Sequence, residues 1–173
     1  MVRFAFFGSE EDDAQGSTGY VESLSDNDRK KIKLYLNIDM VASPNGGYIV
    51  QGGTGDDEDA AGPPGSATIG QVLADQLTKT GVTAPQIIEF AGDDESAFIE
   101  AGIPVGGAEN GDAKKKKPEQ ARIWGGQAGA VYDRCYHQAC DTIDNVNREV
   151  LDHYLKALAA TLAHLATSTD ELR

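Results

Sequence analysis

A run of bulky apolar residues from Val2 to Phe7 stops at Gly8 and is followed by two adjacent carboxylates, Glu10 and Glu11. One of these carboxylates could bind a metal ion while its neighbour takes a proton from a water molecule beside that ion. The alternative interpretation is an ordinary acidic turn in contact with solvent. The continuous apolar run before them predicts a strand that is buried on both faces, as in the interior of an α/β sheet.

Two more places in the chain carry residues that could complete such a site. Asp39 stands at the end of a second predicted strand, residues 32–40, and therefore provides another carboxylate at a strand end. Farther on, Tyr136 and His137 lie between Cys135 and Cys140, the chain's two cysteines. The cysteines could be metal ligands, but an acidic chain with no other cysteine for a four-ligand zinc site favours a disulfide that holds His137 in a short loop.

The remaining pattern predicts an alternation of helices and strands that would position these side chains. Residues 48–51, 87–90 and 102–107 are predicted as short strands, and residues 17–24 and 96–101 as short helices. Ser66 is a candidate N-cap for a helix over residues 67–80. Asn147 is a candidate cap for the last helix, in which leucines repeat at positions 151, 155, 158, 162 and 165 and form one apolar stripe.

Length, composition and charge limit the class of protein. A chain of 173 residues with 40% apolar residues is expected to form one domain over residues 1–173. Its net charge of −13 argues against nucleic acid or an anionic membrane as a partner. No apolar run is long enough to cross a bilayer. The basic run from Lys114 to Lys117 is therefore interpreted as a solvated loop, with nucleic-acid binding as the weaker alternative.

Residues 53–65 are predicted to form a flexible, acidic, glycine-rich loop. Asp56 to Asp59 could collect a cation such as calcium there, but they lack the alternating spacing and the distal glutamate of a calcium loop. A solvated run of charges is the favoured interpretation. Because a core strand would begin directly after Met1, we also expect that Met1 starts an excised or engineered piece of a longer protein.

Five blocks of sequence, taken together, resemble one enzyme family. The blocks are residues 3–11, 35–40, 101–107, 124–126 and 132–141. In order and spacing they resemble the secreted bacterial zinc aminopeptidases of the M28 metallopeptidase family, over nearly the whole of this chain but only the C-terminal part of the family's catalytic domain. The resemblance implies a three-layer α/β/α sandwich with a mostly parallel sheet that lacks N-terminal elements of the family fold, and secretion from the cell.

The resemblance also implies a site with two zinc ions that hydrolyses peptides from a free N-terminus. Glu10 matches the general base, and Tyr136 matches the phenol that polarises the scissile carbonyl. Glu11 and His137 match ligands of one zinc, and Asp39 matches a ligand of the other.

Departures from the family pattern put activity in doubt. The family's first histidine ligand and its bridging aspartate lie upstream of this chain's first strand, so two of five zinc ligands are missing. In the substrate pocket, Gly92 replaces an arginine, Glu95 a histidine or aromatic residue, and Glu109 an aromatic residue. The carboxylates of Glu95 and Glu109 predict a shift of preference from large apolar toward basic N-terminal residues.

Three functions remain open at this point. The first is an aminopeptidase that is impaired in this chain alone, with a missing N-terminal segment of the same enzyme as a partner. The second is a non-catalytic, truncated or redesigned fragment that serves as a scaffold or binding module. The third and weakest is an acidic cation-binding protein that relies on Asp56 to Asp59.

Overall fold

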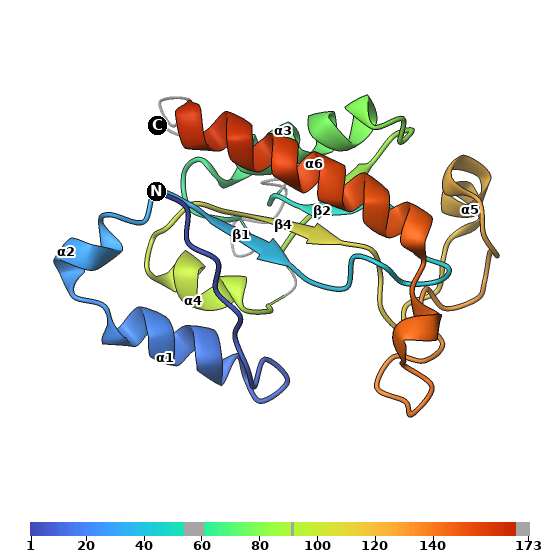
Figure 1. The fold of residues 1–173 in the computed structure, drawn as a ribbon, viewed down its shortest axis with the longest axis horizontal. Coiled ribbons are helices and arrows are strands. Elements are labelled where there is room, and N and C mark those ends of the chain that lie inside the picture. Colours follow the sequence, from blue (N-terminus) through green and yellow to red (C-terminus); the bar gives the residue numbers. More distant parts are fainter. Residues whose placement is uncertain (54–60, 91, 169–173) are drawn as a thin grey trace.

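A mixed four-stranded sheet forms the centre of the fold. The computed structural model describes residues 1–53, 61–90 and 92–168. The sheet contains β1 (Tyr35–Ile38), β4 (Val105–Glu109), β2 (Ile49–Gln51) and β3 (Gln86–Ile88), in that spatial order. The pairs β1–β4 and β2–β3 are parallel, and the central pair β2–β4 is antiparallel. Helices cover both faces of this sheet, which confirms the predicted α/β class (Figure 1).

One helical layer consists of α3 (Ser66–Lys79) and α6 (Arg148–Thr167), which pack against each other on one face of the sheet (Figure 1). Their contact with the sheet makes the largest cluster of buried apolar residues, which includes Val50, Leu73, Leu77, Tyr154 and Ala157. Asn147 caps α6 as predicted, because its side-chain oxygen accepts hydrogen bonds from the backbone N–H groups of Glu149 and Val150.

The opposite layer consists of α1 (Gln15–Ser23) and α4 (Glu95–Glu100). An aromatic cluster joins this layer to the sheet: the rings of Tyr35 and Phe98 stack with centroids 3.9 Å apart, and Phe7 packs beside them. Three further helical segments connect the layers: α2 (Asp26–Arg29), α5 (Pro118–Trp124) and the 3₁₀ helix η1 (Ile143–Asn145).

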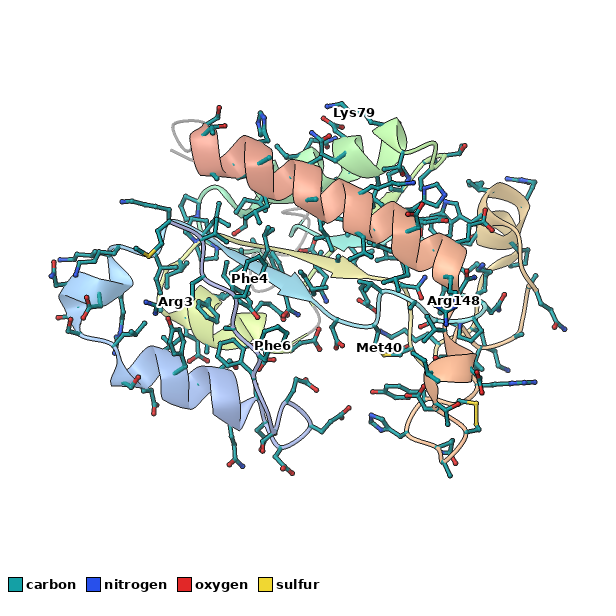
Figure 2. The ribbon with its side chains drawn as sticks, viewed as in Figure 1. Arg3, Phe4, Phe6, Met40, Lys79 and Arg148 are labelled. Carbon is teal, nitrogen blue, oxygen red and sulfur yellow. A yellow bond between two sulfur atoms is a disulfide. The ribbon has the colours of Figure 1, made fainter. Side chains whose placement is uncertain are left out.

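The predicted N-terminal strand is wrong. Residues 1–8 form no ladder with any described strand, and Phe4 and Phe6 are 76% and 96% exposed (Figure 2). A strand requires a paired neighbour as well as apolar side chains, and β1 is paired with β4 alone among the described strands. Phe7 is the residue of this run that packs into a core cluster.

Two smaller expectations also need correction. Ser66 is the first residue of α3, with Gly65 at the N-cap position, and its hydroxyl instead accepts a hydrogen bond from the backbone N–H of Val105. In α6, Leu158 and Leu165 are buried, but Leu155 of the predicted stripe is 58% exposed because it faces an open cleft. The central part of the 53–65 loop, including Asp56 to Asp59, lies outside the described residues. Within the described residues, no helix is long and apolar enough to cross a membrane.

Candidate active site

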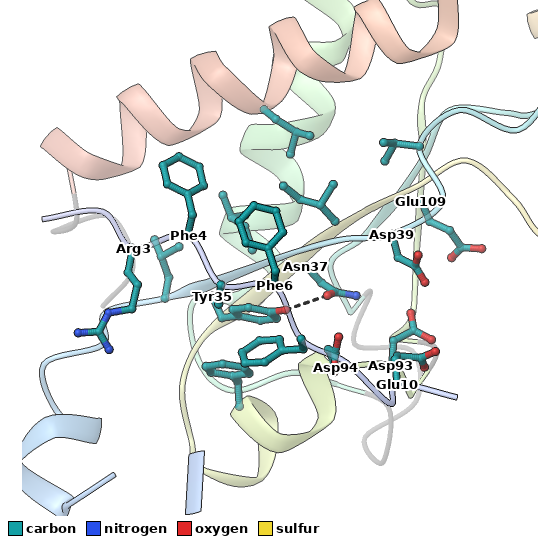
Figure 3. A pocket seen from close by; sticks show the side chains of 18 of the residues that line it. Arg3, Phe4, Phe6, Glu10, Tyr35, Asn37, Asp39, Asp93, Asp94 and Glu109 are labelled. Carbon is teal, nitrogen blue, oxygen red and sulfur yellow. Dashed lines mark hydrogen bonds between the residues drawn. The ribbon is translucent and has the colours of Figure 1, made fainter. Parts of the chain in front are cut away.

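The candidate site lies at one end of a broad cleft of about 1630 Å³. The parallel register of β1 and β4 places Ile38 beside Ala108, so Asp39, which follows β1, lies next to Glu109, the last residue of β4. The turn before α1 brings Glu10 to the same end, and the turn before α4 brings Asp93 and Asp94 (Figure 3). The carboxylates therefore lie together at one end of the cleft, and Phe4, Phe6 and Tyr35 lie toward the other.

Close packing of carboxylates changes their acidity. Partial burial raises the pKa of Glu10, and the negative charges of Asp93 and then Glu11 raise it further. The same two causes, burial and then Asp93, raise the pKa of Asp39. A raised pKa makes Glu10 a stronger base once it is ionised, which suits a group that accepts a proton from water.

His137 and Glu11, which also line the cleft, are in contact with each other. The Nε2 atom of His137 lies against a carboxylate oxygen of Glu11, and the ring of Tyr136 stacks on the imidazole with centroids 3.8 Å apart. The Tyr136 phenol has a raised pKa, first because of burial and next because of the charge of Glu11, so it stays protonated and can donate a hydrogen bond.

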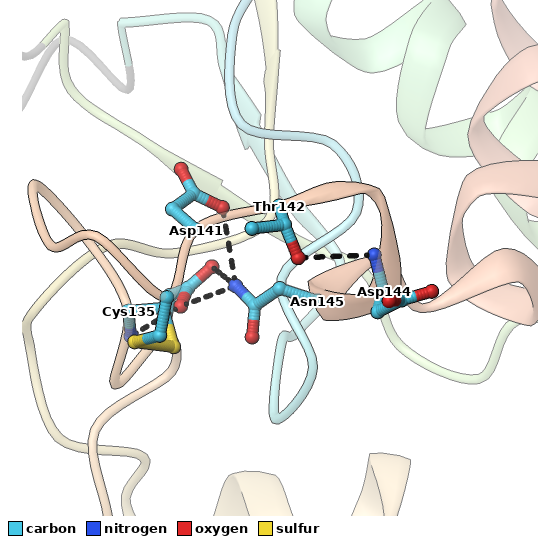
Figure 4. The surroundings of a disulfide bond; sticks show 7 residues. Cys135, Asp141, Thr142, Asp144 and Asn145 are labelled. Atoms are coloured by element: carbon cyan, nitrogen blue, oxygen red, sulfur yellow. Dashed lines mark hydrogen bonds between the residues drawn. A yellow bond between two sulfur atoms is a disulfide. The ribbon is translucent and has the colours of Figure 1, made fainter.

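The predicted disulfide joins Cys135 to Cys140. Its loop is supported by Asp133, whose carboxylate accepts hydrogen bonds from the Cys135 backbone N–H at 2.8 Å and from the Asn145 side chain at 2.9 and 3.1 Å (Figure 4). The Asn145 amide also donates to Asp141 at 3.2 Å. These contacts connect the loop that carries Tyr136 and His137 to η1.

Three non-glycine residues at or next to the candidate site residues have a left-handed backbone conformation. Ser9 precedes Glu10 with φ of 58°, Met40 follows Asp39 with φ of 44°, and His137 itself has φ of 55°. Such a conformation costs about 1–2 kcal/mol for a residue with a Cβ atom. Strain of this kind is concentrated at functional sites, where the surrounding structure enforces it.

The three predicted pocket residues occupy different environments. Glu109 lies in the cleft wall, and burial raises its pKa. Glu95 is fully buried behind the wall: one carboxylate oxygen accepts the backbone N–H groups of Gly92 and Asp93, and the other accepts the side-chain amide of Asn37. Gly92 has φ of 99°, which its lack of a side chain permits. Glu95 therefore shapes the turn that carries Asp93.

Two buried polar residues beside the site were not predicted. Asn37 interrupts the apolar pattern of β1 and accepts a hydrogen bond from the Tyr35 hydroxyl at 2.9 Å. Gln51 interrupts the apolar pattern at the end of β2, and its side-chain amide donates hydrogen bonds to Asp93 and Glu109. A long polar side chain inside an otherwise apolar strand is the signal that could have revealed both.

The residues described here do not assemble a metal site by themselves. No three His, Cys, Asp or Glu side chains in residues 1–53, 61–90 and 92–168 converge so that they could hold one ion. Glu11 and His137 are of the donor types that zinc prefers and are in contact, but they are two ligands where a catalytic zinc has three from the protein.

The chain is similar in sequence to curated aminopeptidases. The chain is 41% identical over 169 residues to an aminopeptidase of Pseudomonas aeruginosa, and 38% identical over 167 residues to leucine aminopeptidase 2 of Trichophyton rubrum. These matches cover 97% and 96% of this chain but 31% and 34% of the relatives. The chain thus spans about a third of the length of these curated relatives.

A solved structure has the same fold. The zinc aminopeptidase of Bacillus subtilis superimposes with a TM-score of 0.66 at 24% identity, over 92% of this chain and 34% of that one. The sequence profile described as Peptidase family M28 matches residues 1–162. The chain therefore belongs to peptidase family M28.

Proposed function

We propose that this chain is the part of a secreted, zinc-dependent aminopeptidase that carries the general base and the carbonyl-polarising phenol, and that it is catalytically impaired alone. The observation that supports this proposal most strongly is the convergence of Glu10, Asp39 and the Glu11–His137 pair on one cleft from distant parts of the chain. The substrate would be a peptide with a free N-terminus, as the names of the curated relatives suggest.

In this proposal Glu10 removes a proton from the water that attacks the peptide carbonyl and delivers it to the departing amine. Tyr136 donates a hydrogen bond to the oxygen on which negative charge develops. Glu11 and His137 would contribute ligands to one zinc ion, and Asp39 would contribute one to another. Because these ligand sets are incomplete, the isolated chain is expected to bind zinc weakly.

A combined zinc titration and aminopeptidase assay tests this function. The chain alone should bind zinc weakly and fail to hydrolyse leucine p-nitroanilide, whereas a longer enzyme, completed with the upstream segment of the Pseudomonas relative, should hydrolyse it. In the completed enzyme, Glu10→Gln should lower kcat by about 100-fold or more. Asp12→Asn, an exposed carboxylate of the same turn, is the matched control and should leave kcat unchanged. Tight binding of two zinc ions with turnover by the chain alone would contradict the proposed impairment.

A second candidate function is a non-catalytic scaffold or binding module. The pair formed by Glu11 and His137, one protein ligand short of a catalytic zinc site, is consistent with this function as well. This function predicts that the completed enzyme is as inactive as the chain alone, although both are folded.

A further inference from the structure

Gln51 is a polar side chain that is almost completely buried, with 1% of its surface exposed. It extends from the end of β2 across β4, where a Cβ atom on Gly107 would stand 2.3 Å from its Oε1 atom. The absence of a side chain at Gly107 therefore provides the space for this amide. Its Nε2 atom donates hydrogen bonds to Asp93 at 3.2 Å and to Glu109 at 3.4 Å. One buried amide thus lies between carboxylates that belong to two different elements.

This arrangement leaves one buried acceptor without a hydrogen bond and two carboxylates without an ion pair among the described residues. The Oε1 atom of Gln51 is buried and has no hydrogen-bond partner within the described part of the chain. Such an acceptor is costly to leave unpaired. The nearby cation Lys114 forms its ion pair with Asp112, and within the described residues no lysine or arginine pairs with Asp93 or Glu109. Asp93 and Glu109, which line the cleft and have no ion pair within the described residues, therefore favour a ligand with positive charge and several N–H donors.

A metal ion does not fit this requirement, because no three side chains of the ligating types converge closely enough among the described residues to hold one. An ammonium or guanidinium group fits better, since its several N–H donors can span separated acceptors. The α-ammonium group of a peptide is common to all N-terminal residues, whereas a cationic side chain would distinguish among them. Figure 3 shows Glu109 and Asp93 beside Asp39 and Glu10, to which the proposed function assigns roles at the N-terminus of the substrate.

We propose that Asp93 and Glu109, positioned by Gln51, bind the cationic side chain of a lysine or arginine at the substrate's N-terminus. This inference rests on the proposed function and names the substrate class of the same site. The sequence predicted that Glu95 and Glu109 favour basic residues. The oxygens of Glu95 already accept hydrogen bonds from Asn37 and two backbone N–H groups, so we assign this role to Asp93 in its place.

Calorimetric titration of the full chain with L-lysinamide and L-norleucinamide tests the subsite without requiring turnover. Both ligands carry an α-ammonium group and a linear side chain, and they differ in the terminal charge. The chain should bind lysinamide about tenfold more tightly, the size of effect expected for a charge-assisted contact. L-Argininamide should share this preference.

Single substitutions identify which carboxylates cause the preference for lysinamide over norleucinamide. Asp93→Asn and Glu109→Gln should each bring the affinity ratio close to one, whereas Glu100→Gln, which removes an exposed carboxylate from the end of α4, should leave the ratio unchanged. Thermal unfolding monitored by circular dichroism verifies that each variant is folded. Equal affinities in the parent chain, no binding of either ligand, or a preference that survives both substitutions would overturn the inference.

Turnover by the completed enzyme separates this inference from the proposed function. Hydrolysis of lysine and norleucine p-nitroanilides at equal kcat/KM contradicts the cationic subsite alone. Preferential binding of lysinamide together with no hydrolysis by the completed enzyme contradicts the peptidase function alone.

Discussion

The imidazole of His137 contacts the carboxylate of Glu11, although 126 residues separate them in the chain. Both side chains are more than half exposed, so an ion pair between them would stabilise the fold by only about 0–1 kcal/mol. The contact matters for geometry, because it brings the acidic turn that carries Glu10 to the disulfide loop that carries Tyr136.

The disulfide between Cys135 and Cys140 should leave no reactive thiol when the unreduced protein is unfolded and titrated. The double variant Cys135→Ser, Cys140→Ser should lose about 2 kcal/mol of unfolding free energy, because the loop between them is short. Urea denaturation measures this loss. Two reactive thiols in the parent protein would show that the bridge does not form.

The buried carboxyl of Glu95 should make stability depend on pH. Burial, followed by the charge of Asp93, raises the pKa of Glu95 in the folded state above its unfolded value. The folded state therefore binds the proton more readily, and stability should fall as the pH rises from the ordinary carboxyl range through the raised pKa. Tm values measured between about pH 4 and pH 8 should show this slope.

Glu95→Gln provides the test of that assignment. Its amide oxygen can still accept the backbone N–H groups of Gly92 and Asp93, but it does not titrate, so the fall in Tm with rising pH should become smaller. Glu100→Gln is the exposed control on the same helix and should retain the parent slope. An undiminished slope in Glu95→Gln would assign the effect to other carboxyls.

Lys116 should be more important for stability than its neighbour. It is 2% exposed, and its ammonium group donates to the backbone carbonyls of Gly46 at 2.7 Å and Gly125 at 2.9 Å. Lys116→Met would leave both carbonyls unpaired, which should cost about 1–3 kcal/mol in urea denaturation. Lys115→Met, at the adjacent exposed position, should change the unfolding free energy by less than about 0.5 kcal/mol. Equal effects of the two substitutions would show that the buried contacts contribute nothing.

Phe6 should contribute little to the stability of this chain, because its side chain is 96% exposed. Phe6→Ser should change the unfolding free energy by less than about 0.5 kcal/mol and reduce the binding of a hydrophobic dye. Phe98→Ala, in the buried aromatic cluster, should instead cost about 3–5 kcal/mol. A large loss in Phe6→Ser would mean that the N-terminal run is a buried strand in solution.

Local patterns in the sequence were sufficient for much of the fold. Alternating and continuous apolar runs predicted β1, β2 and β3, and Asn147 followed by a spaced leucine stripe predicted α6. The five-residue separation of Cys135 and Cys140 favoured a disulfide, which the structure contains. These features depend on residues close together in the chain, where propensity, capping and periodicity act.

The tertiary structure decided what depends on distant partners. The apolar run from Val2 to Phe7 has the composition of a buried strand, but a strand forms only where another backbone pairs with it. Glu95 was predicted to line the pocket, yet Asn37, 58 residues away, and the turn at Gly92 occupy its oxygens. Gln51 could be placed between Asp93 and Glu109 only after the antiparallel pairing of β2 with β4 was known. Hydrogen bonds between segments far apart in sequence leave no local pattern, so the partners of Glu95 and Gln51 could not be predicted from sequence.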